Sequence, residues 1–308
     1  NRILLRIKVI QILFSYYKSN SKDINTAKNE LTISLDKTYE LYMLLLKLAV
    51  EVSDYAKERK ESISKRCKMA GDSNFDSGEK VPADFFAENK IALQLAQNET
   101  LNSFLEGKKL SWSKHPEIIN SLYSDALASQ AYEVAESSNR DYDCDRRFMR
   151  GFYKSVVTSN QMLTDELERM SIYWNDDIET VISFIMKTIA RYEETTPNDY
   201  KLMPKFSDPA DETFGLTLLS KVIYNQAEYD ELITKHIKNW DKDRVAFMDR
   251  IILQTAIAEL FSFPQIPIVV TLNEYVELSK YYSTPRSSTF INGVLDAVVK
   301  DLKEQNKL

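Results

Sequence analysis

The scarcity of turn-forming residues restricts the possible folds of this chain more than any other feature of its sequence. Its 308 residues include only 6 glycines and 8 prolines. Folds built from many short strands need frequent turns, and those turns depend on glycine and proline. The sequence therefore favours long helices with few connections, and we predict an all-α fold.

The clearest helical pattern lies near the C-terminus. Pro267 is predicted to begin a helix, because proline fixes a suitable φ and its missing N–H costs nothing in the first turn. The helix is expected to end near Tyr282, before the Ser-Thr-Pro sequence at 283–285. Apolar residues three and four positions apart are predicted to face a core: Val269, Leu272 and Val276.

A second C-terminal helix is predicted after this break, with Ser287 or Ser288 as its N-cap. Four apolar residues form one stripe along it: Phe290, Val294, Val298 and Leu302. Gly293 lies inside the helix, where glycine costs about 1 kcal/mol relative to alanine. We therefore expect Gly293 to be explained by close packing on a neighbouring backbone.

The N-terminal segment, residues 2–18, predicts a helix that is apolar almost all round. Its polar residues form one narrow stripe: Lys8, Gln11, Ser15 and Lys18. A helix with so narrow a polar face is mostly buried. Arg2 and Arg6 lie one turn apart on another side, and from the residues alone they fit either a solvated helix end or a binding site.

The middle of the chain also shows helical patterns, separated by polar segments. Residues 19–29 are polar and resemble a turn, and residues 195–209 contain three prolines without an apolar period, which makes them the best linker candidate. Further helices are predicted at about 31–60, 83–105, 116–137, 178–189 and 244–260, with a loop at 69–82.

Charge is distributed unevenly along the chain. The net charge is −6, which by itself argues against a nucleic-acid partner. Residues 1–70, however, hold 14 Lys/Arg and 8 Asp/Glu, a local charge of +6. A basic N-terminal quarter on an acidic chain allows an anionic partner to bind locally.

Several classes of protein are disfavoured by what the sequence lacks. No apolar run reaches the roughly 18 residues that a membrane span needs, and we expect a cytoplasmic protein without membrane partners. Cys67 and Cys144 are too few for a disulfide framework. His115 and His236 have no partners at ligand or triad spacing, and phosphate-binding glycine loops are absent. We therefore expect no cofactor, no metal and no enzymatic activity.

The two predicted C-terminal helices carry a resemblance to a known family. Ile266-Pro267, residues 272–280 (LNEYVELSK) and residues 290–296 (FINGVLD) resemble, in order and spacing, the C-terminal signature of the NusB family of bacterial transcription antitermination factors. The run QILFS at residues 11–15 is similar to the first helix of that family. Lys238-Asn239-Trp240 and residues 249–253 and 258–260 resemble the helices just before the signature.

The resemblance implies a NusB-like helical bundle built from both ends of the chain. It covers roughly residues 2–20 and 211–303, and most of the middle has no counterpart. We therefore predict three parts: residues 1–60 and 206–308 as the N- and C-terminal parts of the bundle, and residues 61–205 as a helical insertion.

The function implied by the resemblance is RNA binding in transcription antitermination. The family pairs with the small-subunit ribosomal protein NusE, holds a boxA-type single-stranded RNA and joins the RNA polymerase antitermination complex on ribosomal RNA genes. Asp249 and Glu259 are implied as protein-partner contacts. Six residues are implied as RNA contacts: Arg2, Arg6, Lys8, Phe14, Tyr282 and Arg286.

The chain departs from the family pattern at two places in this RNA site. Ile3, Leu4 and Leu5 stand where the family has arginines, and Arg286 stands where an acidic residue is usual. Arg286 could compensate for the missing N-terminal arginines. The weak arginine cluster also leaves open a structural role in ribosome assembly that uses NusE but little RNA.

A third reading is an enzyme subunit, because NusB-like domains also precede ribosomal RNA methyltransferase domains. The sequence ends at Leu308, shortly after the predicted bundle, so we expect no catalytic domain to follow. The enzyme reading is therefore the weakest of the three.

Overall fold

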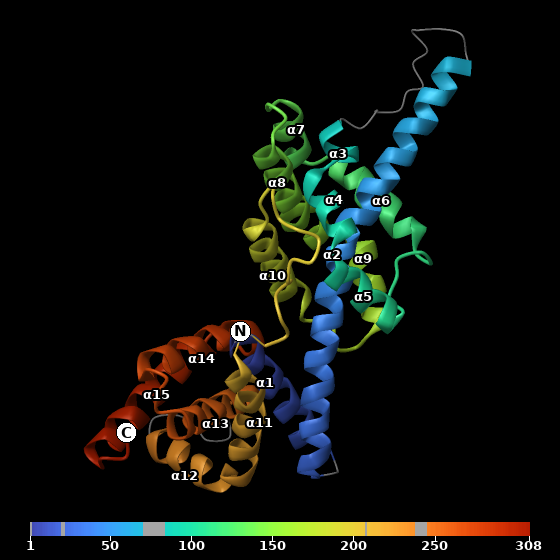
Figure 1. Ribbon diagram of the computed structural model, residues 1–308. Coiled ribbons are helices and arrows are strands. Elements are labelled where there is room, and N and C mark those ends of the chain that lie inside the picture. The colour runs from blue at the N-terminus through green and yellow to red at the C-terminus, as the bar shows by residue number, and fades with distance from the viewer. Residues whose placement is uncertain (1, 20–21, 70–83, 207, 238–244) are drawn as a thin grey trace. The chain divides into compact units, whose positions relative to one another are not determined.

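The structure is a computed structural model that describes residues 2–19, 22–69, 84–206, 208–237 and 245–308. All regular secondary structure within these ranges is helical (Figure 1). The predicted all-α fold is therefore confirmed. The predicted loop at 69–82 and the Lys238-Asn239-Trp240 segment lie, apart from Met69, outside the described residues.

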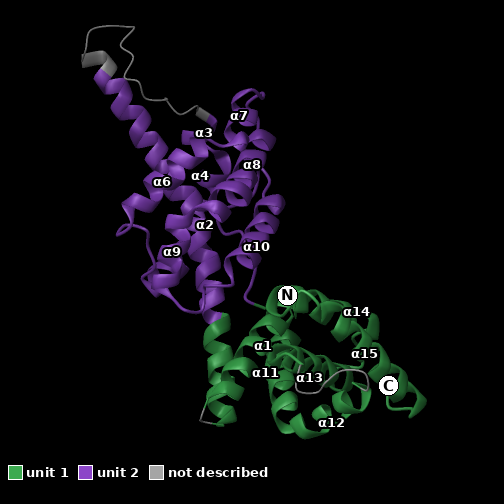
Figure 2. Cartoon of the chain, turned by 180° about the vertical axis from the view of Figure 1, so that it is seen from behind, with its two compact units in different colours: residues 1–35, 206–308 green, residues 36–205 purple. Residues whose placement is uncertain are grey.

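The chain forms two compact units (Figure 2). Unit 1 comprises residues 1–35 and 206–308, and unit 2 comprises residues 36–205. The two units thus divide after residues 35 and 205. The sequence analysis placed the divisions after residues 60 and 205. A single helix, α2 (Ile24–Met69), runs through the first of them.

Unit 1 contains both ends of the chain. Helix α13 (Phe247–Ser262) is its central element, because every residue from Ile251 to Leu260 is buried. Contacts join α13 to α1, α11, α12, α14 and α15. The surrounding helices are α1 (Arg2–Lys18), the first turns of α2, α11 (Pro209–Tyr224), α12 (Gln226–His236), α14 (Ile268–Tyr282) and α15 (Ser287–Glu304).

Helix α15 follows its predicted apolar stripe, since Phe290, Val294, Val298 and Leu302 are all buried. The expectation for Gly293 is wrong: a Cβ at this exposed position would meet no atom within 4 Å. The predicted serine cap is also wrong. The N-cap position belongs to Arg286, and the Ser287 hydroxyl instead accepts from the backbone N–H of Thr284 at 3.1 Å.

Helix α14 begins after Pro267 and ends at Tyr282 as predicted, but its buried face is different. Val269 is 67% exposed, whereas Thr271, Tyr275 and Leu278 are buried. The hydroxyls of Thr271 and Tyr275 both donate to a buried carboxylate on α13. This polar anchor, which periodicity cannot reveal, sets the rotation of the helix.

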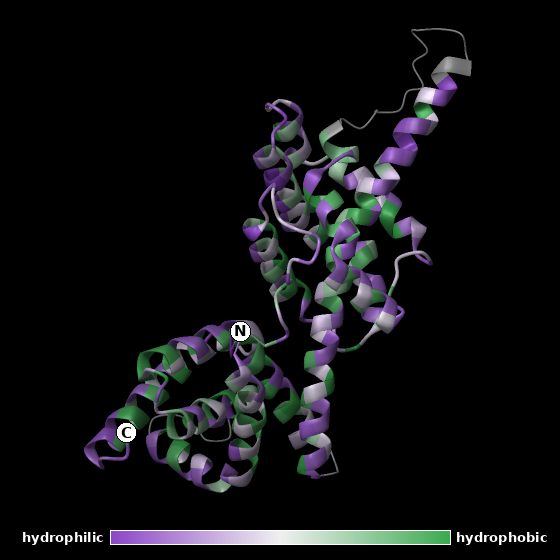
Figure 3. Ribbon diagram, in the orientation of Figure 1, coloured by the Kyte–Doolittle hydropathy of each residue, from purple (hydrophilic) through white to green (hydrophobic). Residues whose placement is uncertain are grey.

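Helix α2 begins earlier and ends later than predicted. The carboxylate of Asp23 accepts from the backbone N–H groups of Asn25 and Thr26 at 3.0 and 3.2 Å, which caps the first turn within a segment expected to be a turn. The last turns of α2, within unit 2, are mostly hydrophilic in Figure 3. They continue the helix to Met69 with few apolar residues, Ile63 being a buried exception.

Unit 2 contains shorter helices than the sequence predicts. The predicted helix at 83–105 is divided at Asn89 and Asn98, and the predicted helix at 116–137 is divided at Ser129. Each of these side chains accepts from backbone N–H groups of the next helix. The elements are α3 (Asp84–Ala87), α4 (Lys90–Gln97), α5 (Glu99–Lys108), α6 (Pro116–Leu127), α7 (Gln130–Glu136), α8 (Tyr142–Gly151), the π-helix η1 (Phe152–Val157), α9 (Gln161–Met170) and α10 (Ile178–Arg191).

Unit 2 also brings its two chain ends together. Lys205, at its last residue, forms an ion pair with Asp36, at its first. The chain therefore enters and leaves this unit at neighbouring points. None of the helices, in the part of the chain that the structure describes, is long and apolar enough to cross a membrane.

Candidate nucleic-acid interface

The predicted site residues of α1 separate into two groups along that helix. Arg6 lies beside Glu259, near the end of α13, whereas Phe14 lies beside Phe247, at its start. The two helices are thus antiparallel. Phe14 lies twelve positions after Arg2 on α1, a rise of about 18 Å along the helix axis. Arg2 and Arg6 therefore cannot share one small contact with Phe14.

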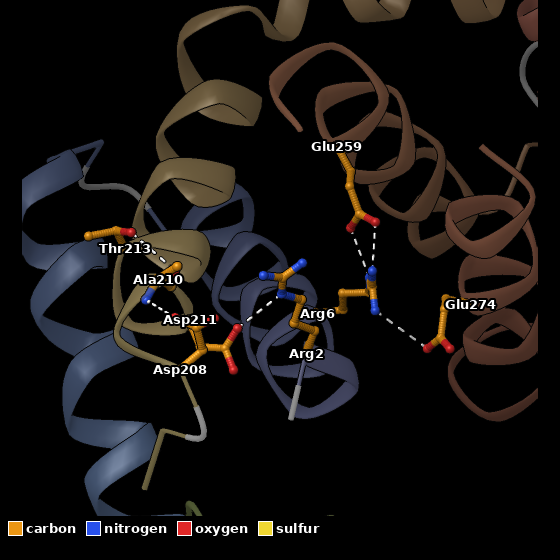
Figure 4. A network of polar contacts seen from close by, with 8 residues as sticks. All are labelled: Arg2, Arg6, Asp208, Ala210, Asp211, Thr213, Glu259 and Glu274. Atoms are coloured by element: carbon orange, nitrogen blue, oxygen red, sulfur yellow. Dashed lines mark hydrogen bonds and ion pairs between the residues drawn. The ribbon is translucent and has the colours of Figure 1, made fainter. Parts of the chain in front are cut away.

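The first group is held inside unit 1 by an ion pair between α1 and α13 (Figure 4). Arg6 Nε donates to Glu259 Oε2 at 2.8 Å, and Nη2 donates to Oε1 at 2.7 Å. Arg6 Nη1 also lies 3.5 Å from Glu274 Oε2 on α14. Arg6 is 3% exposed and Glu259 is 0% exposed, so this bidentate pair is desolvated on both sides.

Both carboxylate oxygens of Glu259 accept hydrogen bonds from neighbouring side chains. Besides Arg6, Thr271 Oγ1 donates to Oε1 at 2.9 Å and the Tyr275 hydroxyl donates to Oε2 at 2.8 Å. Burial lowers the pKa of Arg6, but the hydrogen bonds and charge of Glu259 more than offset this, and the net pKa is raised. Burial and the Glu259 charge raise the pKa of Tyr275 well above its ordinary value. Arg6 is therefore charged and Tyr275 neutral across the physiological pH range.

Arg2 and Lys8 complete the group. Arg2 Nε donates to Asp211 Oδ1 of α11 at 3.0 Å (Figure 4), and its side chain is partly exposed. Lys8 is buried and does not reach the surface, although it belongs to the polar stripe of the sequence. As RNA contacts Arg2, Arg6 and Lys8 stay predictions. In this structure the guanidinium of Arg6 is occupied by Glu259.

The second group lies at the start of α13. Phe14 is 39% exposed, and its ring meets Phe247 edge-on with 5.5 Å between centroids. The ammonium of Lys18 lies 4.4 Å from the Phe247 centroid and 6.0 Å from that of Phe14. An exposed aromatic ring can stack on a nucleic-acid base, and a cation beside it can contact the phosphate of the same nucleotide.

The turn after α14 approaches the same end of α13. Ser283 Oγ donates to Asp249 Oδ1 at 2.5 Å, and Ser287 Oγ donates to Ser283 Oγ at 3.1 Å. These bonds fix the turn that carries Tyr282, which is half-buried, and Arg286, which is exposed. Asp249 is itself buried, so its visible role is to hold this turn.

The structure thus brings Phe14, Tyr282 and Arg286 to one end of α13, and it adds Lys18, which the sequence analysis did not select. Lys18 could have been noticed, because it ends the polar stripe one turn after Phe14. Phe247 could not have been noticed from the sequence, because its contact with Phe14 depends on the antiparallel packing of α1 on α13. The partner contacts Asp249 and Glu259 stay predictions, and both are buried here.

The side chains at the start of α13 are suited to binding. No group of three or more His, Cys, Asp or Glu side chains that could hold a metal occurs among the described residues. Among the described residues, the exposed side chains selected at the start of α13 are an aromatic ring, Phe14, and two cations, Lys18 and Arg286. Such groups stack on bases and neutralise phosphates.

Unit 1 is therefore a helical bundle closed by the two ends of its chain, with aromatic and cationic side chains at one end of its central helix. The model of the NusB family matches residues 183–300. The transcription antitermination protein NusB of Salinibacter ruber is 38% identical over 130 residues, which cover 40% of this chain and 81% of that protein. The protein of the same name from Dictyoglomus turgidum is 42% identical over 105 residues, covering 33% and 73%. This chain belongs to the NusB family.

Proposed function

We propose that this protein is an RNA-binding transcription antitermination factor that pairs with ribosomal protein NusE on a boxA-type single-stranded RNA. The proposal is supported by family membership, since the relatives are named transcription antitermination proteins. The observation that carries it is the group at the start of α13, where Phe14 packs on Phe247 and Asp249 holds the turn between Tyr282 and Arg286.

Each side chain of this group has a proposed role. Phe14 and Tyr282 stack on unpaired bases, and Arg286 and Lys18 contact phosphates. Asp249 positions the turn through Ser283. Arg6 positions α1 against α13 through Glu259, so that Phe14 stays in place beside Phe247.

The test is a titration of fluorescently labelled boxA-type RNA, with NusE present, across a salt series. Each phosphate contact on a single strand contributes a log–log slope of about −0.7. Arg286→Ala should therefore flatten the slope by about 0.7, and Phe14→Ala should weaken binding about tenfold through lost stacking. Lys300→Ala and Val269→Ala are the matched controls, because both side chains are exposed in unit 1 away from this group.

The same titration separates a second candidate function, a structural role in ribosome assembly with little RNA binding. It is favoured by the burial of Arg6 and Lys8, which removes two predicted cations from the surface. If NusE binds in calorimetry while Arg286→Ala and Phe14→Ala keep the wild-type RNA affinity and slope, the assembly role replaces the antitermination contact proposed here.

The NusE contact is tested through Asp249. Asp249→Arg should weaken NusE binding measured by calorimetry, while the helical circular-dichroism spectrum is retained. Ser283→Ala breaks the same hydrogen bond without changing the charge. If Ser283→Ala weakens NusE binding as much as Asp249→Arg, Asp249 acts by holding the turn and not as a contact.

A further inference from the structure

A groove on unit 1 combines free cations with an exposed aromatic ring. Its volume is about 400 Å³, and it lies along one face of α11 with Lys28 of α2 on the other side. Neither Lys28 nor Lys221 forms an ion pair with any side chain that the structure describes, and no acidic residue lines the groove. The α11 face supplies Thr213, Thr217, Ser220, Lys221 and Tyr224.

Tyr224 is not explained by packing. Its side chain is 68% exposed, although tyrosine buries a large apolar area when it has a core to enter. It lies in the last turn of α11, beside the groove rather than within the bundle. An exposed ring and two cations in a groove that no acidic residue lines match the surfaces on which single-stranded nucleic acids stack.

A row of aromatic rings extends from the start of α13 along the end of α1. Tyr16 and Tyr17 meet edge-on at 5.6 Å between centroids, and Tyr17 lies 6.4 Å from Phe247, the ring on which Phe14 packs. At the other end of the row, burial and the charges of Asp23 and Tyr224 raise the pKa of Tyr16.

Cations accompany this row along its length. Lys18 lies over Phe247, and the ammonium of Lys22 lies 5.2 Å from the Tyr16 centroid. Lys22 also donates to the carbonyls of Tyr16 and Tyr17 at 2.8 and 3.0 Å, which satisfies the end of α1 and fixes its own position. Two acids lie near the row. Asp23 is occupied in capping α2, and Asp230, whose charge acts on Tyr17, lies 3.7 Å from Arg250 Nε and accepts a hydrogen bond from Gln254.

We propose that the groove between Lys28 and Tyr224 is a second single-stranded RNA subsite, which holds the nucleotides that flank the segment bound at the start of α13. Lys28 and Lys221 contact phosphates, and Tyr224 stacks on a base. The hydroxyl of Thr217 donates to a phosphate or sugar oxygen, whereas those of Thr213 and Ser220 already donate to the carbonyls of Ala210 and Leu216 and accept from sugar hydroxyls. This inference rests on the proposed RNA-binding function and extends its site.

The test compares a boxA-type RNA with the same RNA extended by about ten uridines at its 5′ or 3′ end, a length within the range that one binding surface covers. Binding to the full protein with NusE is followed by fluorescence anisotropy. One of the two extensions should tighten binding about tenfold and steepen the salt slope by about 1.4, the value expected for two added phosphate contacts.

The gain should depend on the groove alone. The Lys28→Ala/Lys221→Ala variant should lose the added slope, and Tyr224→Ala should lose most of the added affinity while Tyr224→Phe keeps it, because the phenylalanine ring still stacks. All variants should bind the unextended RNA as the wild type does. Lys300→Ala should behave as the wild type with both RNAs.

Two results would overturn the inference. If the wild type gains nothing from either extension while Arg286→Ala still weakens binding of the unextended RNA, the groove is not a subsite and the proposed function stands. If the extension helps every groove variant equally, the added nucleotides bind elsewhere. Failure of the wild type to bind any of these RNAs removes the proposed function and this inference together.

Discussion

Single residues in unit 1 differ sharply in what their charge contributes. Arg6 and Glu259 are both desolvated, and the carboxylate also accepts from Thr271 and Tyr275. Removing one member of such a pair leaves an uncompensated buried charge. Arg2 forms its ion pair with Asp211 while its own side chain is partly exposed, where water screens the interaction.

Arg6→Ala is therefore expected to lower the free energy of unfolding by about 3–5 kcal/mol. Arg2→Ala, on the same face of α1, should cost less than Arg6→Ala, because the Arg2 side chain is 34% exposed, although its partner Asp211 is buried. Urea titration followed by circular dichroism gives both values. A cost for Arg6→Ala no larger than that of Arg2→Ala would show that the pair is not buried in solution.

At the scale of elements, local signals predicted some helices well and others poorly. The stripe of α15 was visible, because four residues at helical spacing meet one core. The face of α14 was missed, since its rotation is set by hydroxyls that reach Glu259 from Thr271 and Tyr275. Periodicity also cannot show that Phe14 and the turn at 283–287 both lie at the start of α13, because this depends on how α1 and α14 pack on α13.

Two helix glycines provide a test of packing at this scale. Gly293 of α15 has open space where a Cβ would lie, whereas a Cβ on Gly151, the last residue of α8, would lie 2.6 Å from Ala131 Cβ. Gly293→Ala should stabilise the protein by about 1 kcal/mol through helix propensity alone. Gly151→Ala should destabilise it, because α7 and α8 must separate.

Thermal unfolding of the Gly293→Ala and Gly151→Ala variants measures both changes in stability. Destabilisation by Gly293→Ala would mean that something packs against α15 in solution. Weaker NusE or RNA binding by a stabilised Gly293→Ala would instead place a partner's backbone against this helix.

At the scale of the whole molecule, charge is divided between the units. Unit 1 has 17 Lys/Arg and 17 Asp/Glu, whereas unit 2 has 23 and 29 and therefore carries the whole net charge of −6. Unit 2 therefore repels an anionic partner more strongly than unit 1 does. The Asp36–Lys205 ion pair joins the two chain ends of unit 2.

Replacing residues 36–205 with a linker of about six Gly/Ser residues should leave unit 1 folded, because its central helix is buried by unit 1 helices. The shortened chain should unfold cooperatively and bind boxA-type RNA with NusE at least as tightly as the full chain. Calorimetric unfolding and the anisotropy titration measure this. Loss of cooperative unfolding would show that the bundle needs unit 2 to fold.

The desolvated pair in unit 1 also constrains how this sequence can change over generations. A substitution at position 6 strands the carboxylate at 259, and a substitution at 259 strands the guanidinium and frees the hydroxyls at 271 and 275. Single changes at these positions are therefore costly, while matched changes are tolerated. Among relatives, the four positions should be inherited together, so that their identities covary although they lie on three helices and up to 269 positions apart in the chain.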